Sequence, residues 1–565
     1  MNALRLRRGL ILPVVLFVLV LVGLLGAMFS FRVNADLAST RAVAVQMQTR
    51  LAAQAGVERI KLLLRTDRFN PDRWYHNPEE LHRVIVWAHD TDPTLWGTHE
   101  EFSSDEQAMA YRFSIVADDP TDDEKYIRIG ITDEASKLNL NTATEDQLLT
   151  LVGGVVGADV EIDPQEIVDA ILDWRDTDSV PRAEGGDTEI DYYRTLPKPY
   201  RVKNGYFDTV EELLLVKGVT GQILYGEDFD RNGLLTDNED DGGKTFPPDN
   251  QDGILNRGLY PYLTVISYEN NVNNENRPRG YLFAKEEVLR RELAFAFGDD
   301  NPAVIDFIVA ATRSSGKNKS QAGAGGAGKS GQPPGGKEEE NNKDTKTGEE
   351  GEGSGEGGED EEADKDETGN ELEDDSSGQS DVDKTGGGGE ASPPIRSPAS
   401  LLLNRSSEGK AQPSPLTVDD LPILMDRFTT LDPKQKEVYG LINVNTAPRQ
   451  VLDCLTGLSE EQVSRILEVR GTLSVEEKAT TAWLVISEVL DLSAYEQIEP
   501  LITARGQQFM VESLGYADHI GTVTRLQVIV DMVGPIAQTL YYRDLTKLGG
   551  HYPIREEQLE AVRVR

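Results

Sequence analysis

Residues 228–239, DFDRNGLLTDNE, carry oxygen-bearing side chains at alternate positions, a pattern that can wrap a hard divalent cation. The spacing fits D-x-[DN]-x-[DN]-G-x5-E, with Gly233 where such a loop turns sharply. The predicted ligands of a structural calcium ion are Asp228, Asp230, Asn232, the carbonyl oxygen of Leu234, Thr236 and Glu239. The alternative is an acidic loop without an ion, since DDGGKTFPPD follows where a helix–loop–helix calcium site continues as a helix.

Three further stretches can be weighed as binding sites. Asp176 and Asp178, with Asp173 before them, can hold a second ion, but an Asp-rich turn after a helix explains them equally well. Residues 249–256, DNQDGILN, are a weaker echo of the calcium pattern that lacks its last carboxylate. Residues 323–330, GAGGAGKS, spell a phosphate-binding loop, but they lack the strand before and the helix after that such a loop requires.

The composition argues against an enzyme and against a nucleic-acid binder. The 565 residues include 98 Asp and Glu against 57 Lys and Arg, and the resulting net charge of −41 repels phosphate backbones at long range. Six scattered histidines form no zinc or triad motif. The single cysteine, Cys454, excludes an intrachain disulfide. We therefore expect no catalysis and no nucleic acid as a partner.

The N-terminus predicts a membrane anchor. Residues 10–31 contain no charge and are enough for a helix to cross a bilayer. Arg5, Arg7 and Arg8 precede them, which places the short N-terminus in the cytoplasm. Helical periodicity continues as far as Leu62, so we expect one long helix, apolar first and amphipathic afterwards. An ordinary signal anchor and a cleaved signal peptide are the plainer alternatives.

One phrase, [LI]-N-[LV]-N-T-A, occurs twice, beginning at Leu138 and at Ile442. Each copy is followed by a helical pattern that ends in arginine, EIVDAILDWR at 166–175 and EQVSRILEVR at 461–470. Both copies resemble a helix-hairpin-helix unit, in which short polar side chains cap the first helix. The expected caps are Asn141, Thr142, Asn445 and Thr446. The hairpins carry acids where DNA-binding members carry basic residues, so a packing role is favoured.

These motifs together resemble the minor pseudopilin K family of type II secretion systems, also called general secretion pathway protein K. The family pattern is carried by DEASKLNLNTA at 133–143, DWRDTDSVP at 173–181, DTVEELLLVKGVT at 208–220 and INVNTAPRQVL at 442–452. The N-terminus is similar to type IV pilins, whose leader is cut after a glycine and whose new amine is methylated. The matching bond lies between Gly9 and Leu10. Val14 stands where most pilins have Glu, a departure that is typical of this pseudopilin.

The resemblance implies an α+β fold in which a long pilin-like helix and an antiparallel sheet carry a large inserted α-helical domain that binds calcium. The expected segments are a leader at 1–9, a transmembrane helix at 10–31, the pilin-like helix and first strands at 32–137, the α-domain with its calcium loop at 138–313, a disordered acidic linker at 314–415, the second helix-hairpin-helix-like part at 416–505 and the C-terminal strands at 506–565.

The resemblance also implies a non-enzymatic subunit at the tip of the pseudopilus. Such a subunit spans the bacterial inner membrane once and has most of its chain in the periplasm. The implied partners are minor pseudopilins I and J, other pseudopilins and the secretion machinery. The main alternative is a membrane-anchored, competence-type DNA receptor built on helix-hairpin-helix repeats, and a calcium-dependent adhesion module is a third class.

Overall fold

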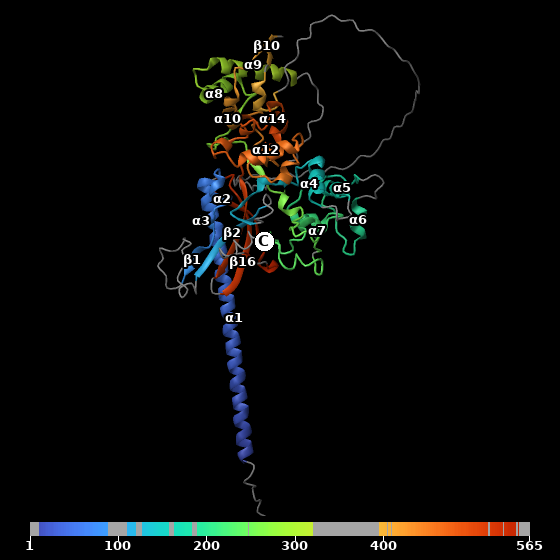
Figure 1. The fold of residues 1–565 in the computed structure, drawn as a ribbon, viewed down its shortest axis with the longest axis vertical. Helices are drawn as coiled ribbons and strands as arrows, with labels where there is room; N and C mark the ends of the chain where they lie inside the picture. The colour runs from blue at the N-terminus through green and yellow to red at the C-terminus, as the bar shows by residue number, and fades with distance from the viewer. Residues whose placement is uncertain are drawn as a thin grey trace, which may run out of the picture.

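The computed structural model describes residues 11–88, 110–119, 127–156, 163–182, 189–246, 248–319, 395–403, 405–407, 410–517, 520–534, 536–549 and 552. The predicted cleavage site at Gly9 and Leu10 and the GAGGAGKS string lie outside these residues. Figure 1 shows a long helix that projects from a body made of a sheet and many short helices.

The long helix, α1 (Ile11–Asp67), is 57 residues of mostly apolar side chains. Pro13 stands in its first turn, where the N–H that proline lacks has no partner within the helix in any case. Large apolar side chains are exposed from Leu12 to Val43, and buried positions begin at Val45. Within the described residues, α1 is the helix long and apolar enough to cross a membrane, judged by length and composition. The expected long N-terminal helix is confirmed.

A seven-stranded antiparallel sheet receives the second half of α1. Its main path runs β1-β2-β15-β16-β17, with β3 beside β2 and β4 beside β15. The strands are β1 (Val84–Ala88), β2 (Ala110–Asp118), β3 (Ile127–Ile129), β4 (Thr132–Asp133), β15 (Gln508–Ala517), β16 (Ile520–Asp531) and β17 (Gln538–Asp544). Two short helices, α2 (Pro71–Trp74) and α3 (Pro78–Leu81), join α1 to β1. The α+β class with an antiparallel sheet is therefore confirmed.

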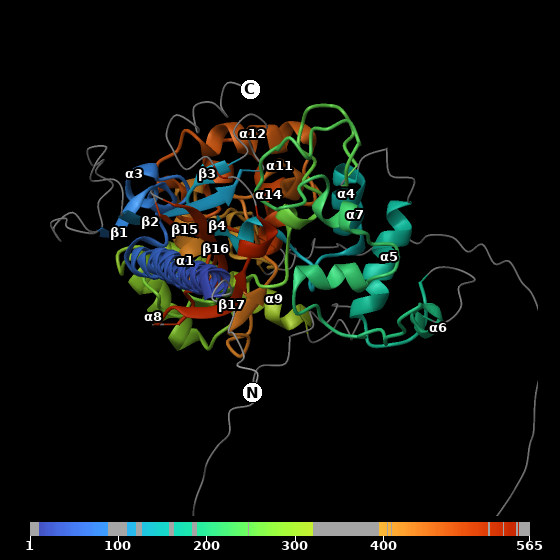
Figure 2. The same ribbon diagram turned by 90° about the horizontal axis from the view of Figure 1, so that it is seen from below.

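Small residues let α1 lie very close to this sheet. Ala52 and Ala53 are fully buried on the face of α1 that meets the strands. A Cβ atom at Gly515 of β15 would lie well under 3.0 Å from the Thr49 carbonyl oxygen, a distance that real Cβ atoms do not show. Ser513 donates a hydrogen bond to the Ala53 carbonyl, 2.8 Å. Figure 2 shows α1 on one side of the sheet and α4, α5 and α7 on the other.

The described residues of 134–267 and 440–507, between β4 and β15, form the insertion, whose two halves share one core. The first half contains β5 (Leu138–Asn139), α4 (Glu145–Val155), α5 (Pro164–Arg175), α6 (Glu189–Thr195), α7 (Gly221–Tyr225) and β6 (Leu263–Thr264). The second half contains β13 (Ile442–Asn443), α11 (Arg449–Leu452), α12 (Glu460–Arg470), α13 (Trp483–Ile486), α14 (Leu492–Ile498) and β14 (Ile502–Thr503). Leu148 and Ile171 of the first half belong to the same apolar cluster as Val451 and Ile466 of the second.

The two copies of the repeated phrase fold alike. β5 pairs in parallel with β6, and β13 pairs in parallel with β14. In each copy the first asparagine, Asn139 or Asn443, accepts the backbone N–H two residues later, at 2.9 and 3.1 Å. Each therefore closes a tight turn out of its short strand.

The arginine that ends the second helix of each copy stabilises the turn through hydrogen bonds to its carbonyl oxygens. Arg175 donates to the carbonyl oxygens of Leu140 and Ala143, at 2.5 and 2.6 Å. Arg470 donates to those of Val444 and Ala447, at 3.3 and 2.6 Å. These carbonyls have equivalent positions in the two copies, so the phrase and its distant arginine form one structural unit that occurs twice.

The expected caps are wrong. α4 is capped by Thr144, whose hydroxyl accepts the Gln147 N–H in a capping box, and the N-cap of α11 is Pro448. Asn141 instead exchanges two hydrogen bonds with the Phe207 backbone. Asn445 donates to the carbonyls of Lys478 and Ala504, and Thr446 bonds Asp133. Thr142 lies within the turn, its N–H bonded to the Asn139 carbonyl. The turn after each strand delays the helix by several residues, which moves these side chains off the helix end.

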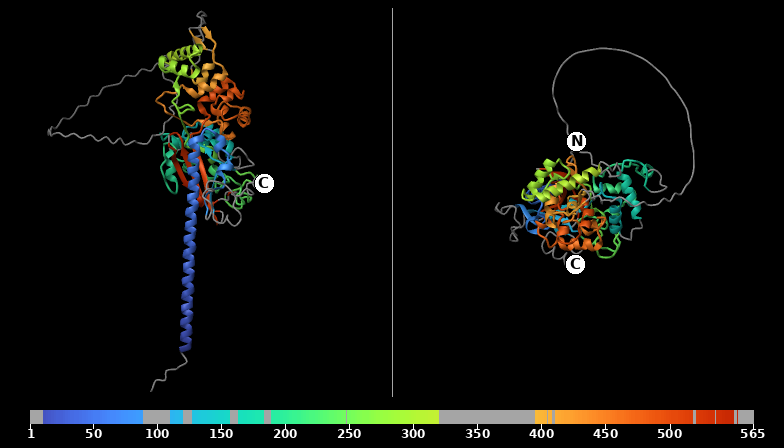
Figure 3. Two further views of the ribbon diagram at one scale, coloured as in Figure 1. Left: turned by 90° about the vertical axis from the view of Figure 1, so that its left-hand side faces the viewer. Right: turned by 90° about the horizontal axis from the view of Figure 1, so that it is seen from above.

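A third body, the distal module (residues 280–319 and 395–429), lies at the end opposite the free end of α1 (Figure 3). Its elements are β8 (Gly280–Tyr281), α8 (Glu286–Phe297), α9 (Pro302–Lys319), the 3-10 helix η6 (Pro398–Leu402), the hairpin β9 (Arg405–Ser407) and β10 (Lys410–Gln412), α10 (Leu421–Arg427) and β11 (Phe428–Thr429). A small antiparallel pair, β7 (Tyr268–Asn270) with β12 (Glu437–Tyr439), joins it to the insertion.

The expected linker at 314–415 is too long at both ends. α9 continues to Lys319, and the chain forms elements again from residue 395. Ile395 and Leu401 are buried in the core of the distal module with Leu293 and Ile308. The reason is the apolar stretch IRSPASLLL, which can bury surface although low-complexity sequence precedes it. Residues 320–394 lie outside the described residues.

Candidate metal centre

Three acidic side chains of the predicted calcium loop come together in the structure. One carboxylate oxygen from each of Asp228, Asp230 and Glu239 lies within 4.8 Å of the others. The exposed fractions of Asp228 and Glu239 are only 6% and 2%. The loop begins directly after α7, whose last residue is Tyr225. The sequence spacing and the geometry therefore select the same residues.

The loop turns through backbone conformations that the sequence pattern requires. Arg231 and Gly233 both have positive φ, 57° and 70°. This turn aims the N–H groups of Asn232 and Gly233 at the two carboxylate oxygens of Asp228, each at 3.0 Å. The loop is thus folded around Asp228, as a cation loop is folded around its first ligand.

The remaining predicted ligands lie in the same loop. Asn232 is buried, and its Oδ1 accepts the N–H of Leu234. Thr236 donates both its N–H and its hydroxyl to Glu239, at 2.9 and 2.7 Å, which holds that carboxylate over the loop. The assignment of these residues as ligands, Leu234 by its carbonyl included, stays a prediction.

The loop holds three acidic side chains close together, two of them buried. Burial raises the pKa of the Asp228 carboxyl well above its usual value, and the charges of Asp118, Glu239 and Asp230 raise it further. Like charges held this close repel unless a cation lies between them. The donor atoms are all hard oxygens, the set that suits calcium or magnesium and not zinc or copper. The residues therefore fit a calcium ion.

A residue that the sequence pattern did not select closes a second loop beside the first. Glu227 is 4% exposed, and its two carboxylate oxygens accept the N–H groups of Asn250 and Asn256, at 2.9 and 3.1 Å. The weaker echo at 249–256 therefore wraps around Glu227, next to Asp228 in the chain. Gly226 and Gly258, with φ of 63° and 59°, allow the chain just before Glu227 to touch the chain just after this loop. The only sequence signal was an acid directly before the first predicted ligand.

The second candidate site, Asp176 and Asp178, does not gather a comparable set. Within the described residues, no third Asp, Glu, His or Cys joins these two at metal-binding distance. Asp178 accepts the Val180 N–H, as an Asp-rich turn does. Burial, and then the charge of Asp178, raise the pKa of the Asp176 carboxyl. These two residues as ligands stay a prediction without further support.

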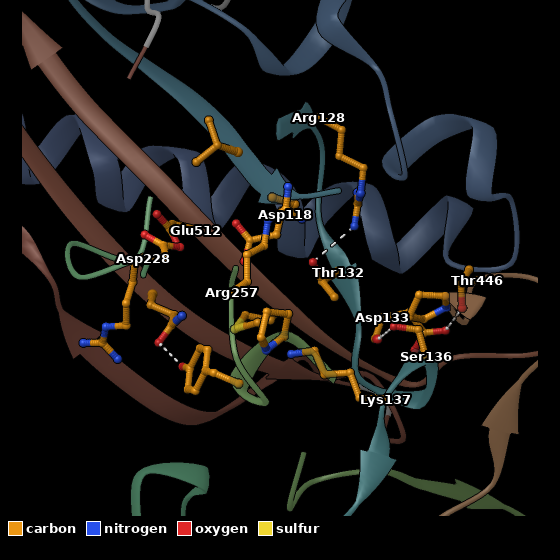
Figure 4. Close-up of a pocket in the computed structure, with 18 of the residues that line it drawn as sticks. Asp118, Arg128, Thr132, Asp133, Ser136, Lys137, Asp228, Arg257, Thr446 and Glu512 are labelled. Carbon is orange, nitrogen blue, oxygen red and sulfur yellow. Dashed lines mark hydrogen bonds between the residues drawn. The ribbon is translucent and has the colours of Figure 1, made fainter. Parts of the chain in front are cut away.

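The predicted calcium loop lies against the face of the sheet that α1 leaves free. A cavity of about 50 Å³ separates the two, and Asp118, Asp228, Arg257 and Glu512 line it (Figure 4). Burial raises the pKa of the Asp118 carboxyl, and the nearby Arg257 guanidinium lowers it in part. Charged groups are therefore enclosed where the insertion meets the sheet.

A second buried junction ties the end of β4 to the second copy of the phrase. Asp133, at the end of β4, accepts hydrogen bonds from Asn443 Nδ2 and Thr446 Oγ1, at 2.7 and 3.0 Å. A Cβ at Gly506 would overlap this carboxylate, so only glycine fits there. Burial raises the pKa of Asp133 to about 6, although both hydrogen bonds lower it.

Comparison with known proteins bears on the first copy of the phrase. Residues 133–225 match the family model for the type II secretion system (T2SS), protein K. This segment belongs to the protein K family. The resemblance seen in the sequence is thereby confirmed over these residues. The protein K segment begins at Asp133, contains α4 to α7 and ends at Tyr225, so the calcium loop starts just beyond it.

One solved structure is also similar. It is the crystal structure of the GspK-GspI-GspJ complex from the enterotoxigenic Escherichia coli type 2 secretion system, at 9% sequence identity and a TM-score of 0.36. The alignment covers 89% of this chain and 98% of that chain. No curated protein sequence matches the chain.

Proposed function

We propose that the chain is a minor pseudopilin that acts at the tip of a type II secretion pseudopilus, with a structural role in assembly and protein secretion and no catalytic one. The observation that carries the proposal is the protein K segment, which is inserted into a sheet that packs on the long apolar helix α1. A pilin subunit needs such a helix and sheet to join a filament, and the protein K match over residues 133–225 supports this class for the insertion.

The shape of the molecule supports the proposed tip position. The insertion and the distal module lie at the end away from the exposed half of α1 (Figure 3). A subunit that packed above this one would meet the bulk of both. The chain is therefore suited to end a filament, and its distal face to contact cargo or the outer-membrane channel.

The membrane part of the proposal rests on the N-terminus. The exposed apolar half of α1 crosses the bacterial inner membrane before assembly, and the larger remainder is periplasmic. Processing between Gly9 and Leu10, followed by methylation, releases the helix for the filament. The proposed partners are minor pseudopilins of the I and J types, which accompany GspK in the solved complex.

The two copies of the phrase are proposed to be helix-hairpin-helix-like packing units. The second hairpin places Glu460 and Glu461 at the start of α12, where a DNA-binding hairpin presents basic groups. No observation favours the DNA-receptor alternative.

The proposed function is tested by the mass and N-terminal sequence of the protein extracted from native membranes. A chain that begins at N-methylated Leu10 is expected, because a prepilin peptidase cuts after Gly9. A chain that still begins at Met1 would mark an ordinary signal anchor and would contradict the pseudopilin proposal.

We also propose a calcium ion in the loop at 228–239. Calcium at 100 times its Kd is expected to stabilise the full-length protein by about 2.7 kcal/mol, because the ion binds the folded chain alone. The variant Glu239→Gln should lose this gain, while Asp237→Asn, an exposed acid of the same loop, should keep it. Thermal unfolding in calcium and in chelator measures the difference. Equal calcium responses of Glu239→Gln and the unmodified chain would refute the site.

A further inference from the structure

We propose that Arg525, on β16 of the sheet, is a positioning residue that shapes the calcium loop, so that calcium affinity depends on the docking of the insertion on the sheet. The proposal rests on the calcium site proposed above. Arg525 lies far from the loop in sequence, and no metal motif includes it. Its side chain is 3% exposed, so it is enclosed by the two bodies that it joins.

The guanidinium of Arg525 bonds the backbone of the loop at its turn. Nη1 donates to the Asp230 carbonyl at 2.7 Å, and Nη2 donates to the carbonyl of Arg231. Arg231 is the residue with positive φ that aims the next two N–H groups at Asp228. Arg525 therefore fixes the two peptide units between the second and third predicted ligands, Asp230 and Asn232.

The sheet in turn fixes the guanidinium. Nε donates to Glu512 Oε1, on the neighbouring strand β15, and the plane lies over the Tyr552 ring at 5.2 Å. The Tyr552 hydroxyl donates to the same Glu512 oxygen. An arginine suits this place because its planar fork can serve a carboxylate and two carbonyls at once, which the single ammonium of lysine cannot.

The strand that carries Arg525 also touches α1. Side chains alternate between the two faces of a strand, so Thr524 points to the other face, where its hydroxyl lies 2.8 Å from that of Thr49. Strand β16 therefore contacts the loop through Arg525 on one face and α1 through Thr524 on the other. By reciprocity, if docking on the sheet strengthens calcium binding, calcium strengthens docking by the same factor.

The experiment titrates the full-length protein in detergent with calcium and measures Kd by calorimetry. Arg525→Gln is expected to raise Kd at least tenfold. Arg525→Lys, which keeps the charge but not the fork, is expected to raise Kd by less. Arg505→Gln is the control, because Arg505 forms another buried ion pair, with Glu269, both side chains 6% exposed. This control should lower Tm and leave the calcium Kd unchanged.

Hydrogen exchange without calcium gives a second readout. In chelator, the amides of Asn232 and Gly233 should exchange faster in Arg525→Lys than in the unmodified chain, and not in Arg505→Gln. The proposal is overturned if both Arg525 variants bind calcium within twofold of the unmodified chain. It also falls if the unmodified chain binds no calcium, a result that leaves the pseudopilin proposal intact, because that is decided by the N-terminal mass.

Discussion

Gly515→Val is expected to prevent α1 from docking on the sheet and to leave little folded protein. A Cβ at this position would lie well under 3.0 Å from the Thr49 carbonyl oxygen and the Ala53 nitrogen, which are backbone atoms of α1 and cannot rotate away. The helix would have to leave the strands along its buried length. The loss in free energy of unfolding should be larger than in ordinary overpacking, which costs about 1–3 kcal/mol because side chains can adjust.

Urea unfolding of the two glycine variants of this sheet measures that cost. Gly521→Val is the matched control, because Gly521 is on the adjacent strand β16 and has no atom within 4 Å of its Cβ position. The control is expected to stay within about 0.5 kcal/mol of the unmodified chain, as exposed substitutions do. Similar losses in both variants would mean that α1 does not pack on β15 as described.

Arg470→Met should destabilise the second half of the insertion by about 2–6 kcal/mol. The change leaves the Val444 and Ala447 carbonyls without their donor. Each buried carbonyl that loses its hydrogen bond lowers the free energy of unfolding by about 1–3 kcal/mol. Arg465→Met, on the same helix, removes a half-exposed side chain that pairs with Glu468 and should cost well under 1 kcal/mol.

The equivalent arginine extends this comparison. Arg175→Met should cost a similar amount, because Arg175 binds the matching carbonyls Leu140 and Ala143. Chemical denaturation of the three methionine variants provides the free energies of unfolding. If Arg470→Met lowers the free energy of unfolding no more than Arg465→Met does, water must replace the arginine as donor to these carbonyls. The arginine would then not stabilise the repeated unit.

The long helix, the C-terminal strands and the acidic cluster at 228–239 were predictable because each depends on a local sequence pattern. Apolar runs, the alternation of apolar and polar residues, and the D-x-D-x-N-G spacing can each be recognised within a short stretch of sequence. The local patterns also located the repeated phrase correctly. They failed to place its caps, because Asn139 and Asn443 turn the chain before the helix begins.

What could not be predicted depends on residues that meet only in the folded chain. Nothing near Arg525 in the sequence indicates a loop almost three hundred residues earlier, and Glu227 has no spacing rule of its own. The pairing of β2 with β15 is likewise a tertiary fact, since both strands show the same alternation as their neighbours. The elements at 395–403 are hard to predict because this short apolar stretch directly follows a long tract rich in Gly, Ser and Glu.

The sheet has a consequence for the order in which the protein can fold. β15 is the central strand, and it pairs Glu512 with Val116 of β2, so every residue of the insertion must be synthesised before the sheet closes. Until then the edge of β2 that will receive β15 is unpaired, and such open edges recruit other chains. Contacts this distant in sequence also form slowly. A nascent chain that pauses before Gln508 therefore depends on chaperones or on rapid completion to avoid aggregation.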